Sequence, residues 1–593
     1  MSSETRDWFL RRAAEAVPFL IEHFDPTTGC FHPENWDERY NNAIYPLAYL
    51  YCTESPHNPH QGAEHLLQAA LAGADFYVKE QNEFGEWPHA PSGGYCLAEW
   101  PAYYLAETLL LLGDGVSSEQ RAQWEGALER YAKHASRRPF SFTSPSNEAW
   151  KCLALYRVGQ VLARPEWSEA GKFQLTQLNK MQHPEGYWEE PISGHGPSPA
   201  YHLLHLGALG LFATHCSDAG LDLALGRAVG FAVAAAYPDG PPLDCLDGRS
   251  AFAPEAVLSG VPGLSRSREG RRLITSTCAL LDDLRAPDPR FAFASTWEAF
   301  IEPCFLVDAY RYFAETAEPA ALAPAAATTL GASATVRNGP WFAAACGETG
   351  DAALLLPHWA ALERQSRLSL WHECWGALVG GGSQGRTSVL PLANVMLSTD
   401  YHDVGCSFGE VRSYARLEPQ DPTQIATAYR LPRHAAVEVS DTSLQLLLVF
   451  GHGEVVLEVR PLDAGSCRIE FRTHLQGVKS AFCQLPLLLI HDTRIGSDGG
   501  TPQPVPLARP EWLTRNIEQS LVLERPRRGV RVTISRPRDC KVRFHAPVHP
   551  GLGRLADEQF EPAFAVGLLS AQLSRPEGEN SLTFDLRIET VSR

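Results

Sequence analysis

Residues 185–202 have the sequence EGYWEEPISGHGPSPAYH, a loop rich in glycine and proline that leads into an apolar helical pattern over residues 203–212. The start of this loop has a partial copy 101 residues earlier, because Gln182-x-x-x-Gly186-x-Trp188 repeats Gln81-x-x-x-Gly85-x-Trp87. A loop that recurs between helical patterns is typical of an array of helical hairpins. Ionisable residues on such a loop, here His195 and Tyr201, occur where binding and catalysis usually take place.

Most of residues 5–315 have the spacing of helices. Apolar residues recur every three to four positions over 8–19, 43–51, 63–77, 102–112, 121–134, 149–162, 172–181, 203–215, 221–236 and 297–313. The connectors are rich in glycine, proline and aromatic residues and recur about every 50 residues, the length of one helical hairpin with its loop. Such hairpins form an open solenoid or a closed ring. The aromatic connectors favour the ring, because there they would converge on a central cleft.

The pattern changes after the helical part. Residues 316–333 are rich in Ala, Pro and Thr, which predicts a linker. Residues 334–593 contain short segments of alternating apolar and polar residues, such as 444–450 and 467–474, which are typical of antiparallel strands. The predicted fold is therefore α+β and multidomain: an (α/α) toroid or incomplete barrel over residues 1–315, the linker, and an antiparallel β-sandwich over residues 334–593.

Composition restricts the class of protein. With 44% apolar and 20% charged residues the chain is globular rather than disordered. A net charge of −18 without any basic block argues against nucleic acid and anionic membranes as partners. The 14 cysteines form no C-x-x-C pair, so they indicate neither a zinc nor a redox motif. The sequence indicates no cofactor, and a structural divalent metal ion stays open as an alternative.

The expected location is the cytoplasm. The N-terminus has no apolar signal core, and no run of about 18 apolar residues could span a bilayer. The alternative is a secreted or periplasmic protein from which the signal peptide has been removed.

Four polar residues fall in successive connectors of the predicted ring or at their edges. Asn147 precedes His195 by 48 residues, Tyr201 follows six residues later, and Arg249 another 48 residues on. At one hairpin per ~50 residues, all four would emerge on the same rim of the ring. The set suits proton abstraction beside a carboxylate, as in β-elimination from a uronic acid. An amide makes the carboxylate less negative, and a tyrosine can exchange protons if nearby cations lower its pKa from about 10.

The order of these residues resembles that of the (α/α)-toroid polysaccharide lyases, namely the hyaluronate/chondroitin lyase, heparinase II/III and alginate lyase groups. The stretch from Gly186-Tyr-Trp through Gly194-His195 to Tyr201-His202 is similar to their glycine-aromatic, His, then Tyr sequence. The resemblance implies that Asn147 neutralises the carboxylate, that His195 and Tyr201 move protons, and that Arg249 positions the sugar. It implies an acidic poly- or oligosaccharide as the partner.

The chain departs from these families at two places. Asn147 is followed by Glu148, where the heparinase-like groups usually have His. Their His-x-His-x-Asp sequence in the β domain is missing, and His372 and His402 are the candidate substitutes.

Further residues near the loops are candidates for contacting the sugar: Trp87, His89, Trp188, Glu190, His202 and His402. Each also has an ordinary structural explanation. Asn147 could simply cap its helix, the tryptophans could wedge the hairpins apart, and Arg249 could pair with a neighbouring aspartate.

Two other functions are open on the sequence alone. One is a glycoside hydrolase on the same helical ring, which needs two carboxylates beside the scissile bond. Its candidates are Glu86, Glu99, Glu148, Glu189, Glu190 and Asp247. The other is a glycan-binding protein without catalysis, in which the aromatic loops serve binding alone.

Overall fold

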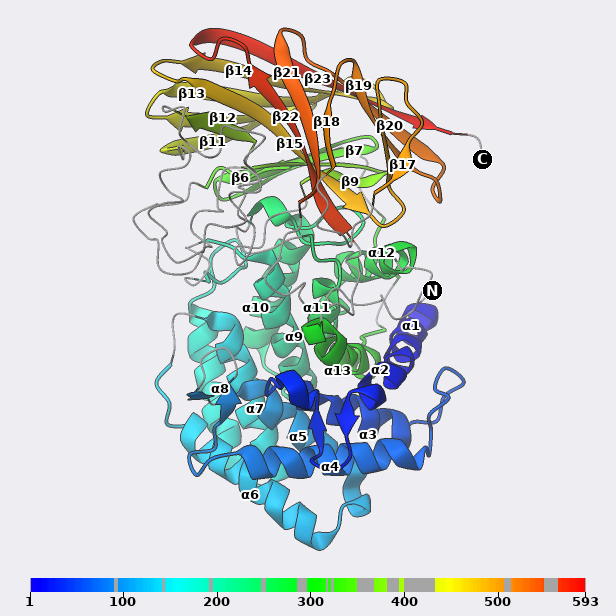
Figure 1. The fold of residues 1–593 in the computed structure, drawn as a ribbon. Helices are drawn as coiled ribbons and strands as arrows, with labels where there is room; N and C mark the ends of the chain where they lie inside the picture. Colours follow the sequence, from blue (N-terminus) through cyan, green and yellow to red (C-terminus); the bar gives the residue numbers. More distant parts are fainter. Residues whose placement is uncertain are drawn as a thin grey trace.

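Helices fill one half of the molecule and antiparallel strands the other (Figure 1). The computed structural model describes residues 2–89, 94–96, 98–140, 144–190, 196–246, 252–284, 296–315, 318–321, 325–348, 367–380, 394–398, 432–505, 513–548 and 564–591. Helices precede the large antiparallel sheets along the chain, which confirms the predicted mixed α+β class. No helix within the described ranges has the length and apolar character needed to cross a membrane.

Six helices contact one another in a closed cycle. Each helix contacts the next, and the last contacts the first, in the order α3 (Ile44–Cys52), α5 (Glu99–Leu112), α7 (Pro145–Val161), α9 (Pro199–His215), α11 (Ala256–Leu264) and α13 (Thr296–Tyr312). Their sequences explain this placement: α5, α7 and α9 are buried on nearly all sides, as expected for helices without a polar face. We call these six the inner helices.

A second set of helices packs outside the cycle. The set comprises α1 (Ser2–Glu15), α4 (Glu64–Glu80), α6 (Ser118–Ala135), α8 (Pro165–Lys180), α10 (Ala219–Ala234) and α12 (Arg268–Leu284). The short α2 (Val17–Glu22) follows α1. Two helices of the fold, α11 over 256–264 and α12 over 268–284, lie where no helix was predicted.

The inner helices run in the same direction. Between α7 and α9, the Trp150 indole donates to the Leu204 carbonyl near the helix starts (3.1 Å), and the Tyr156 hydroxyl donates to the His215 carbonyl near the ends (3.0 Å). Because one contact joins the two starts and the other joins the two ends, α7 and α9 must be parallel. Contacts between the other inner helices likewise join start to start or end to end, so these helices are also parallel. The N-terminal ends of all six therefore lie on one side of the cycle, which we call the rim.

The repeated Gln-x-x-x-Gly-x-Trp segment is a turn that joins three structural elements. The Gln182 amide donates to the Gly186 and Ala224 carbonyls (both 2.8 Å), and the Trp188 indole donates to the Leu178 carbonyl (2.9 Å). The earlier copy makes the equivalent bonds: from Gln81 to Gly85 and Ala127, and from Trp87 to Tyr77. The turn thus fixes the end of one outer helix against the next outer helix, twice.

Replacing Gly186 by alanine should destabilise the fold strongly. Gly186 has φ +101°, and a Cβ there would lie 2.2 Å from the Arg227 carbonyl oxygen. Backbone strain and overpacking together predict a loss of about 3 kcal/mol in the free energy of unfolding, measured by urea denaturation. Gly226→Ala is the matched control, since Gly226 is an exposed helical residue with open space around it and should gain about 0.5–1 kcal/mol. Equal effects of the two changes would contradict this account.

The centre of the helical cycle is filled rather than open. Near the rim lies a layer of aromatic side chains whose rings contact one another edge-to-face or at a tilt: Trp100, Tyr103, Trp150 and Phe305. Deeper, toward the C-terminal ends, lies a set of charged and phenolic groups that we call the central ion network: Tyr45, Tyr104, Glu107, Arg157, Asp308 and Arg311. All of them are buried except Arg311, which is partly exposed. The network joins α3, α5, α7 and α13.

Asp308 should make stability depend on pH. Burial raises the pKa of its carboxyl group to about 7, against hydrogen bonds from Tyr45 (2.6 Å) and Tyr104 (3.2 Å) and the charge of Arg311. Between about pH 4 and 7 the folded state then binds more protons than the unfolded state, so stability falls as the pH rises, by at most about 1.4 kcal/mol per pH unit. Asp308→Asn should remove this part of the slope in urea titrations between pH 5 and 7. If the free energy of unfolding changed with pH equally in the wild type and in Asp308→Asn, the proposed role of Asp308 would be contradicted.

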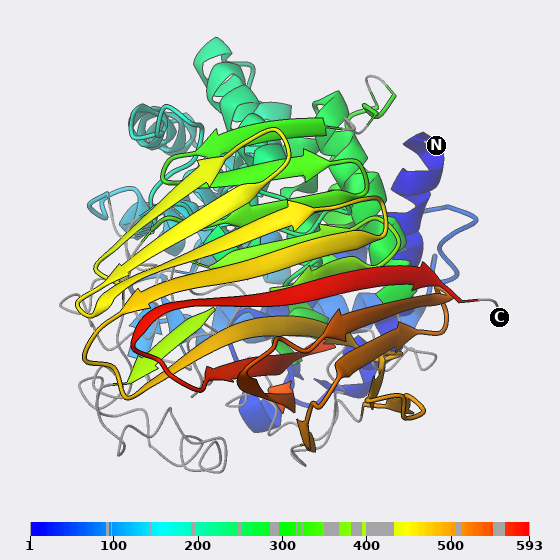
Figure 2. The same ribbon diagram turned by 90° about the horizontal axis from the view of Figure 1, so that it is seen from above.

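Two antiparallel sheets form the C-terminal half. The ten-stranded sheet has the order β18 (Leu513–Asn516), β21 (Cys540–Val548), β22 (Phe564–Leu573), β15 (Ser480–Ile490), β9 (Gly376–Val379), β8 (Leu368–His372), β7 (Trp341–Ala345), β6 (Ser333–Asn338) and β5 (Ala325–Leu330), with β10 (Val395–Ser398) also on β15. The nine-stranded sheet, spread across the view from above, has the order β11 (His434–Val439), β12 (Leu444–Phe450), β13 (Gly453–Pro461), β14 (Ser466–Leu475), β23 (Gly578–Thr590), β20 (Val530–Ser535), β19 (Ser520–Arg525), β16 (Arg494–Ser497) and β17 (Gln503–Pro504) (Figure 2).

The two sheets bury one shared apolar core between them. Leu446 and Phe584 from the nine-stranded sheet belong to the same buried cluster as Leu485 and Phe544 from the ten-stranded sheet. The alternation in the sequence explains this, since every second residue of β12 is buried.

The predicted linker over residues 316–333 is too long. β5 begins at Ala325 and pairs with β6, with Gly331 at φ +59° in the turn between them. Alanine and threonine indicated a linker by composition, but they also fit a strand whose ladder hydrogen bonds come from β6.

The helical and β halves are joined by a third apolar cluster. Phe231 and Tyr237 from the helical half pack with Phe342 and Trp371 from the ten-stranded sheet. Polar contacts cross the same boundary: an ion pair of 2.7 Å between Arg528 and Asp283, and a hydrogen bond of 2.8 Å from the Gly331 N–H to the Glu185 carboxylate. The loop that begins at residue 185 therefore touches the β half directly.

Candidate active site

Asn147 and Tyr201 occupy equivalent positions on neighbouring inner helices. Each is the third residue of its helix, and both helices begin with proline after a serine, α7 at Pro145 and α9 at Pro199. One turn further along, Trp150 of α7 donates to the Leu204 carbonyl of α9. Because the helices are parallel, the first turns that carry Asn147 and Tyr201 lie side by side on the rim. Asn147 is exposed and Tyr201 partly buried.

Glu190 connects the preceding loop to this rim. Its carboxylate is buried and accepts a hydrogen bond of 2.9 Å from the Ser146 backbone N–H. The first N–H groups of a helix lack partners within the helix, so this bond satisfies one of them. The prediction that Glu190 contacts the sugar is wrong: it holds the loop against α7, immediately beside Asn147.

Glu148 points into the protein where Asn147 points out. Glu148 and Lys151, one helical turn apart, form a buried ion pair, with exposed fractions of 3% and 0%. Consecutive helical residues face about 100° apart, so the exposed Asn147 and the buried Glu148 are compatible with one helix. Glu148 occupies the position where the heparinase-like groups usually have His. It is paired with Lys151 inside the protein and does not face the rim.

Glu99 is a second carboxyl group on the rim, because it opens α5. Its carboxylate lies 3.5 Å from the Arg138 guanidinium. Burial raises the pKa of Glu99 to about 7, against the opposing charge of Arg138. A carboxyl group with this pKa carries a proton part of the time at neutral pH and can act as an acid.

Both predicted tryptophans belong to the core. Trp87 is 0% exposed and Trp188 3%, and each indole N–H is bonded to a backbone carbonyl of the preceding helix. A sugar cannot stack on a ring that is covered by protein, so the prediction of substrate contact is wrong for both. The glycine turn accounts for this burial, because it folds each tryptophan back against the helix that precedes the turn.

The predicted role of His202 is also wrong. Its ring is 4% exposed, and Nε2 lies 2.9 Å from the Ala228 carbonyl oxygen. Burial lowers its pKa to about 4, so the imidazole is neutral and serves packing. His372 is buried in the same way, with Nε2 2.9 Å from the Ala464 carbonyl oxygen, so it is not a substitute for the missing histidine of the β domain.

Other candidates lie beyond what the structure describes. His195, Arg249, Asp247 and His402 fall outside the described residues, and for His89 only the backbone is placed, in strand β3 (Trp87–His89) opposite β4 (Gly94–Cys96). Their roles stay predictions. Among the residues that the structure places, no three His, Cys, Asp or Glu side chains are arranged to hold a metal ion.

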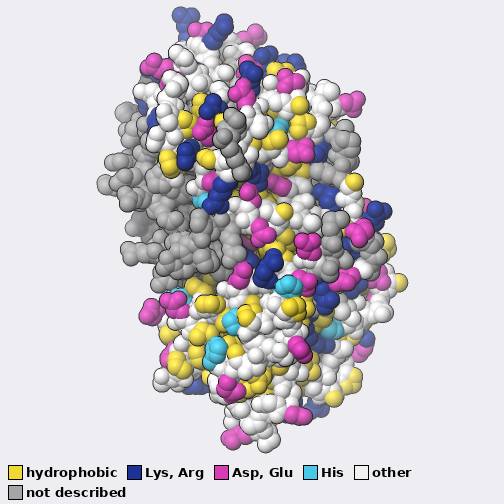
Figure 3. All heavy atoms as spheres, turned by 90° about the vertical axis from the view of Figure 1, so that its right-hand side faces the viewer, with side chains coloured by type: hydrophobic (Ala, Val, Ile, Leu, Met, Phe, Trp, Pro, Cys, Tyr) yellow, Lys and Arg dark blue, Asp and Glu magenta, His cyan; other side chains and the backbone are white. Residues whose placement is uncertain are grey.

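The charge of the surface is mixed. On the face shown in Figure 3, acidic and basic side chains are interspersed, and most of the histidines lie over the helical half. The net charge of −18 is therefore not gathered into one acidic block on this face.

The fold is that of the polysaccharide lyases. No family model and no curated protein sequence matches the chain. Solved structures do match: a xanthan lyase from Paenibacillus aligns with a TM-score of 0.53 and 11% identity over 98% of this chain and 56% of that one. A chondroitin AC lyase from Streptomyces coelicolor A3, solved as a variant, aligns with a TM-score of 0.53 and 13% identity over 99% of this chain and 80% of that one.

These structures confirm the resemblance inferred from the sequence at the level of the fold. The chain spans just over half the length of the xanthan lyase that it matches. At 11–13% identity, substrate and mechanism do not transfer with the fold.

Proposed function

We propose that the protein is a lyase that cleaves a uronic-acid-containing polysaccharide or oligosaccharide by β-elimination. The observation that carries the proposal is the placement of Asn147 and Tyr201 on the first turns of two adjacent parallel helices, in a fold similar to that of polysaccharide lyases. In this proposal the helical half is an (α/α) toroid, residues 1–315, and the two sheets are a β-sandwich, residues 334–593.

The proposed reaction has three parts. The Asn147 amide donates to the uronate carboxylate and reduces its negative charge, which makes the C5 proton more acidic. Tyr201 takes the C5 proton as its phenolate, and the C5–H electrons form the C4=C5 double bond while the C4–O bond breaks. The same tyrosine returns the proton to the leaving oxygen. The products are a 4,5-unsaturated uronate and a new free hydroxyl on the other fragment.

His195 and Arg249 complete the proposed site. A phenolate at neutral pH needs a neighbouring cation, since the pKa of tyrosine is otherwise about 10. We assign that task to these two residues, by their spacing along the chain and by the resemblance to the lyase groups. His89 and His402 are proposed as sugar contacts on the same basis.

The buried carboxylates favour this reaction over glycoside hydrolysis. Hydrolysis needs two carboxyl groups beside the bond. Glu148 is paired with Lys151 and Glu190 is bonded to the Ser146 backbone, so neither is available to a substrate. Of the remaining candidate carboxyl groups, Glu99 has a pKa raised by burial, and Asp247 lies outside the described residues.

The test is a digestion of hyaluronan, chondroitin, heparan sulfate, xanthan and alginate, followed by ultraviolet absorbance and mass spectrometry. Elimination should produce the absorbance of the conjugated unsaturated uronate, with fragment masses that add up to the mass of the substrate. Fragments that together gain one water for each bond broken, without absorbance, would instead establish a hydrolase.

A further inference from the structure

The end of helix α6 and the turn that packs against it carry an exposed surface of aromatic and cationic side chains. Phe84, in the first Gln-x-x-x-Gly-x-Trp turn, is 52% exposed, and its ring meets the ring of His134 edge-on, with centroids 5.7 Å apart and planes at 85°. Lys133, Arg137 and Arg138 are also exposed. The N–H groups of both arginines donate to the His134 carbonyl (3.1 and 3.0 Å), so they continue the last turn of the helix. We call these five residues the α6 surface.

The turn holds Phe84 in a defined place. The Phe84 N–H donates to the side-chain oxygen of Asn82 (2.9 Å). Gly85 follows with φ +75°, and a Cβ there would lie 2.6 Å from the Tyr131 backbone nitrogen, so the turn lies directly on α6. A ring on an ordered backbone loses less conformational entropy when a ligand binds than a ring on a free loop does.

The second copy of the turn packs against a helix that corresponds to α6. Gln81 bonds to α6 at Ala127 and Gln182 bonds to α10 at Ala224, so α10 is the structural counterpart of α6. Counted from these two alanines, the positions that carry the histidine and the cations of the α6 surface are small or apolar on α10: Gly230, Phe231, Ala234 and Ala235.

On α10 the corresponding surface packs against the β half. Phe231 and Ala235 belong to the third apolar cluster, which joins the helical half to the ten-stranded sheet. The counterpart of Phe84 is Glu185, which accepts the hydrogen bond from the Gly331 N–H. One copy of the hairpin thus contacts the β half through apolar residues, whereas the other copy presents an aromatic ring and positive charge to solvent.

The composition of the α6 surface matches an acidic sugar chain. Arg138 pairs with Glu99, but among the residues that the structure describes neither Lys133 nor Arg137 forms an ion pair. The dipole of α6 favours cations at this end of the helix, but it does not require an exposed aromatic ring. The acidic groups of a glycan accept charge-assisted hydrogen bonds from such cations, and the apolar face of a sugar ring packs on an aromatic ring.

The α6 surface lies beside the rim that carries Asn147. The ion pair between Arg138 and Glu99 connects it to the first residue of α5, and α6 also contacts α7. Because the axes of packed helices are about 8–10 Å apart, the α6 surface lies roughly that distance outward from the first turn of α7. A chain of a few sugar residues spans this distance.

We infer that the α6 surface is an outer binding site for an acidic glycan, which holds sugar residues of the same chain that is cleaved beside Asn147 and Tyr201. The position of the cleaved bond rests on the proposed function, whereas the binding of the glycan to the α6 surface does not. The surface contributes to the affinity for long chains and leaves the chemistry at Tyr201 unchanged.

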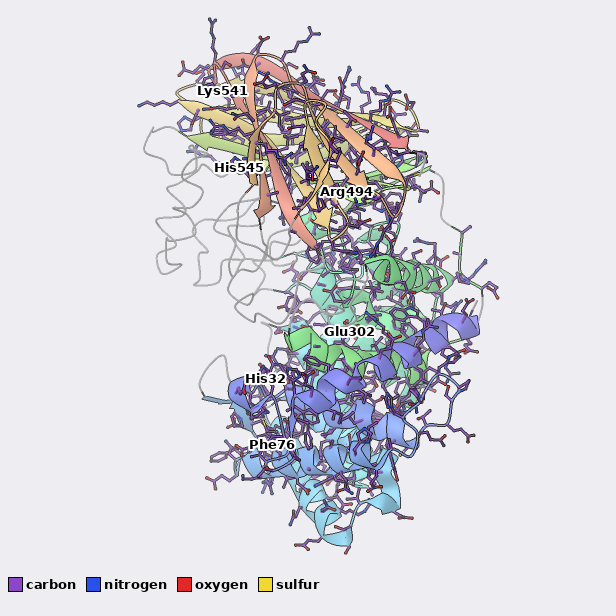
Figure 4. The ribbon with its side chains drawn as sticks, turned by 45° about the vertical axis from the view of Figure 1, so that its right-hand side comes forward. His32, Phe76, Glu302, Arg494, Lys541 and His545 are labelled. Carbon is purple, nitrogen blue, oxygen red and sulfur yellow. The ribbon has the colours of Figure 1, made fainter. Side chains whose placement is uncertain are left out.

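The experiment compares chain lengths in variants of exposed residues, whose replacement should leave the fold intact. For the glycan that the wild type cleaves, KM for an octasaccharide should rise at least fivefold in Lys133→Gln/Arg137→Gln and in Phe84→Ala, while kcat, and KM for a tetrasaccharide, change less than twofold. Arg494→Gln/Lys541→Gln is the matched control, because it removes one arginine and one lysine from exposed positions in the β half (Figure 4). This control should leave both KM and kcat unchanged.

The outcomes separate this inference from the proposed function. If no glycan is cleaved, calorimetry with octasaccharides of hyaluronan, chondroitin, heparosan and alginate still tests the α6 surface. Binding that Lys133→Gln/Arg137→Gln weakens would then support the α6 surface although the elimination proposal fails. The inference is overturned if KM changes equally for short and long chains, if the control variant weakens binding as much, or if the wild type binds no octasaccharide. Single-stranded DNA that binds as tightly as the glycan would also overturn it, by showing a surface for polyanions in general.

Discussion

Tyr201→Phe is expected to reduce kcat of glycan cleavage by about 10²–10⁴-fold, the usual contribution of a positioned acid or base. The change removes only the phenolic oxygen, which the proposed mechanism uses both to take the C5 proton and to return it to the leaving group. Substrate affinity should change little, because the ring and Asn147 remain in place. Initial rates from the absorbance of the unsaturated product, together with calorimetric binding to the inactive variant, measure the two effects separately.

Tyr156→Phe is the matched control for this experiment. Tyr156 lies on the same pair of helices, but its hydroxyl bonds to the His215 carbonyl at the opposite end from the rim. Losing this bond should cost about 1 kcal/mol of stability and leave kcat unchanged. If a folded Tyr201→Phe variant kept full activity, Tyr201 would not be the residue that transfers the proton.

Glu107→Gln should have the largest effect on stability. The Glu107 side chain is completely buried and holds two arginines, with Oε1 2.6 Å from the Arg157 Nε and Oε2 3.0 Å from the Arg311 Nη1. The amide keeps the shape of the side chain but leaves two guanidinium groups, the buried Arg157 and the partly buried Arg311, without this counter-charge. Breaking a buried ion pair in this way typically costs 3–5 kcal/mol, so we expect a loss of about that size in urea unfolding.

Asp585→Asn provides the comparison for Glu107→Gln. Asp585 pairs with Arg468 at 2.8 Å on the exposed face of the nine-stranded sheet, and such surface pairs contribute about 0–1 kcal/mol. A loss of less than about 1 kcal/mol in Glu107→Gln, as for a surface pair, would contradict the expected contribution of the central ion network to stability.

The sequence predicted the helical hairpins because their signals are local. The Gln-x-x-x-Gly-x-Trp copies lie where a glycine with positive φ must turn the chain, and hydrophobic spacing located most helices. The helix α11 was missed because its sequence, AVLSGVPGL, contains two glycines and a proline. Those glycines are needed because Gly260 and Gly263 pack directly against Leu203 and Leu206 of α9.

The site was predicted only in part, because spacing does not tell which way a side chain points. Asn147 and Tyr201 could be placed on one rim by counting residues per hairpin. Trp87 and Trp188 were wrong for the reason that made them conspicuous: a motif that occurs twice serves the hairpin, which is repeated, whereas a reaction centre is needed once. His202 was wrong because its ring is buried against the Ala228 carbonyl. The central ion network had no local signal, since Tyr45 and Asp308 are 263 residues apart.

The common direction of the inner helices has an electrostatic consequence. Each helix carries the equivalent of about half a positive charge at its N-terminus, where the backbone N–H groups point outward. All six inner helices direct this end toward the rim of Asn147 and Tyr201. A protein with a net charge of −18 can therefore present a locally attractive field to an anionic chain without a basic patch, by the alignment of its peptide dipoles alone.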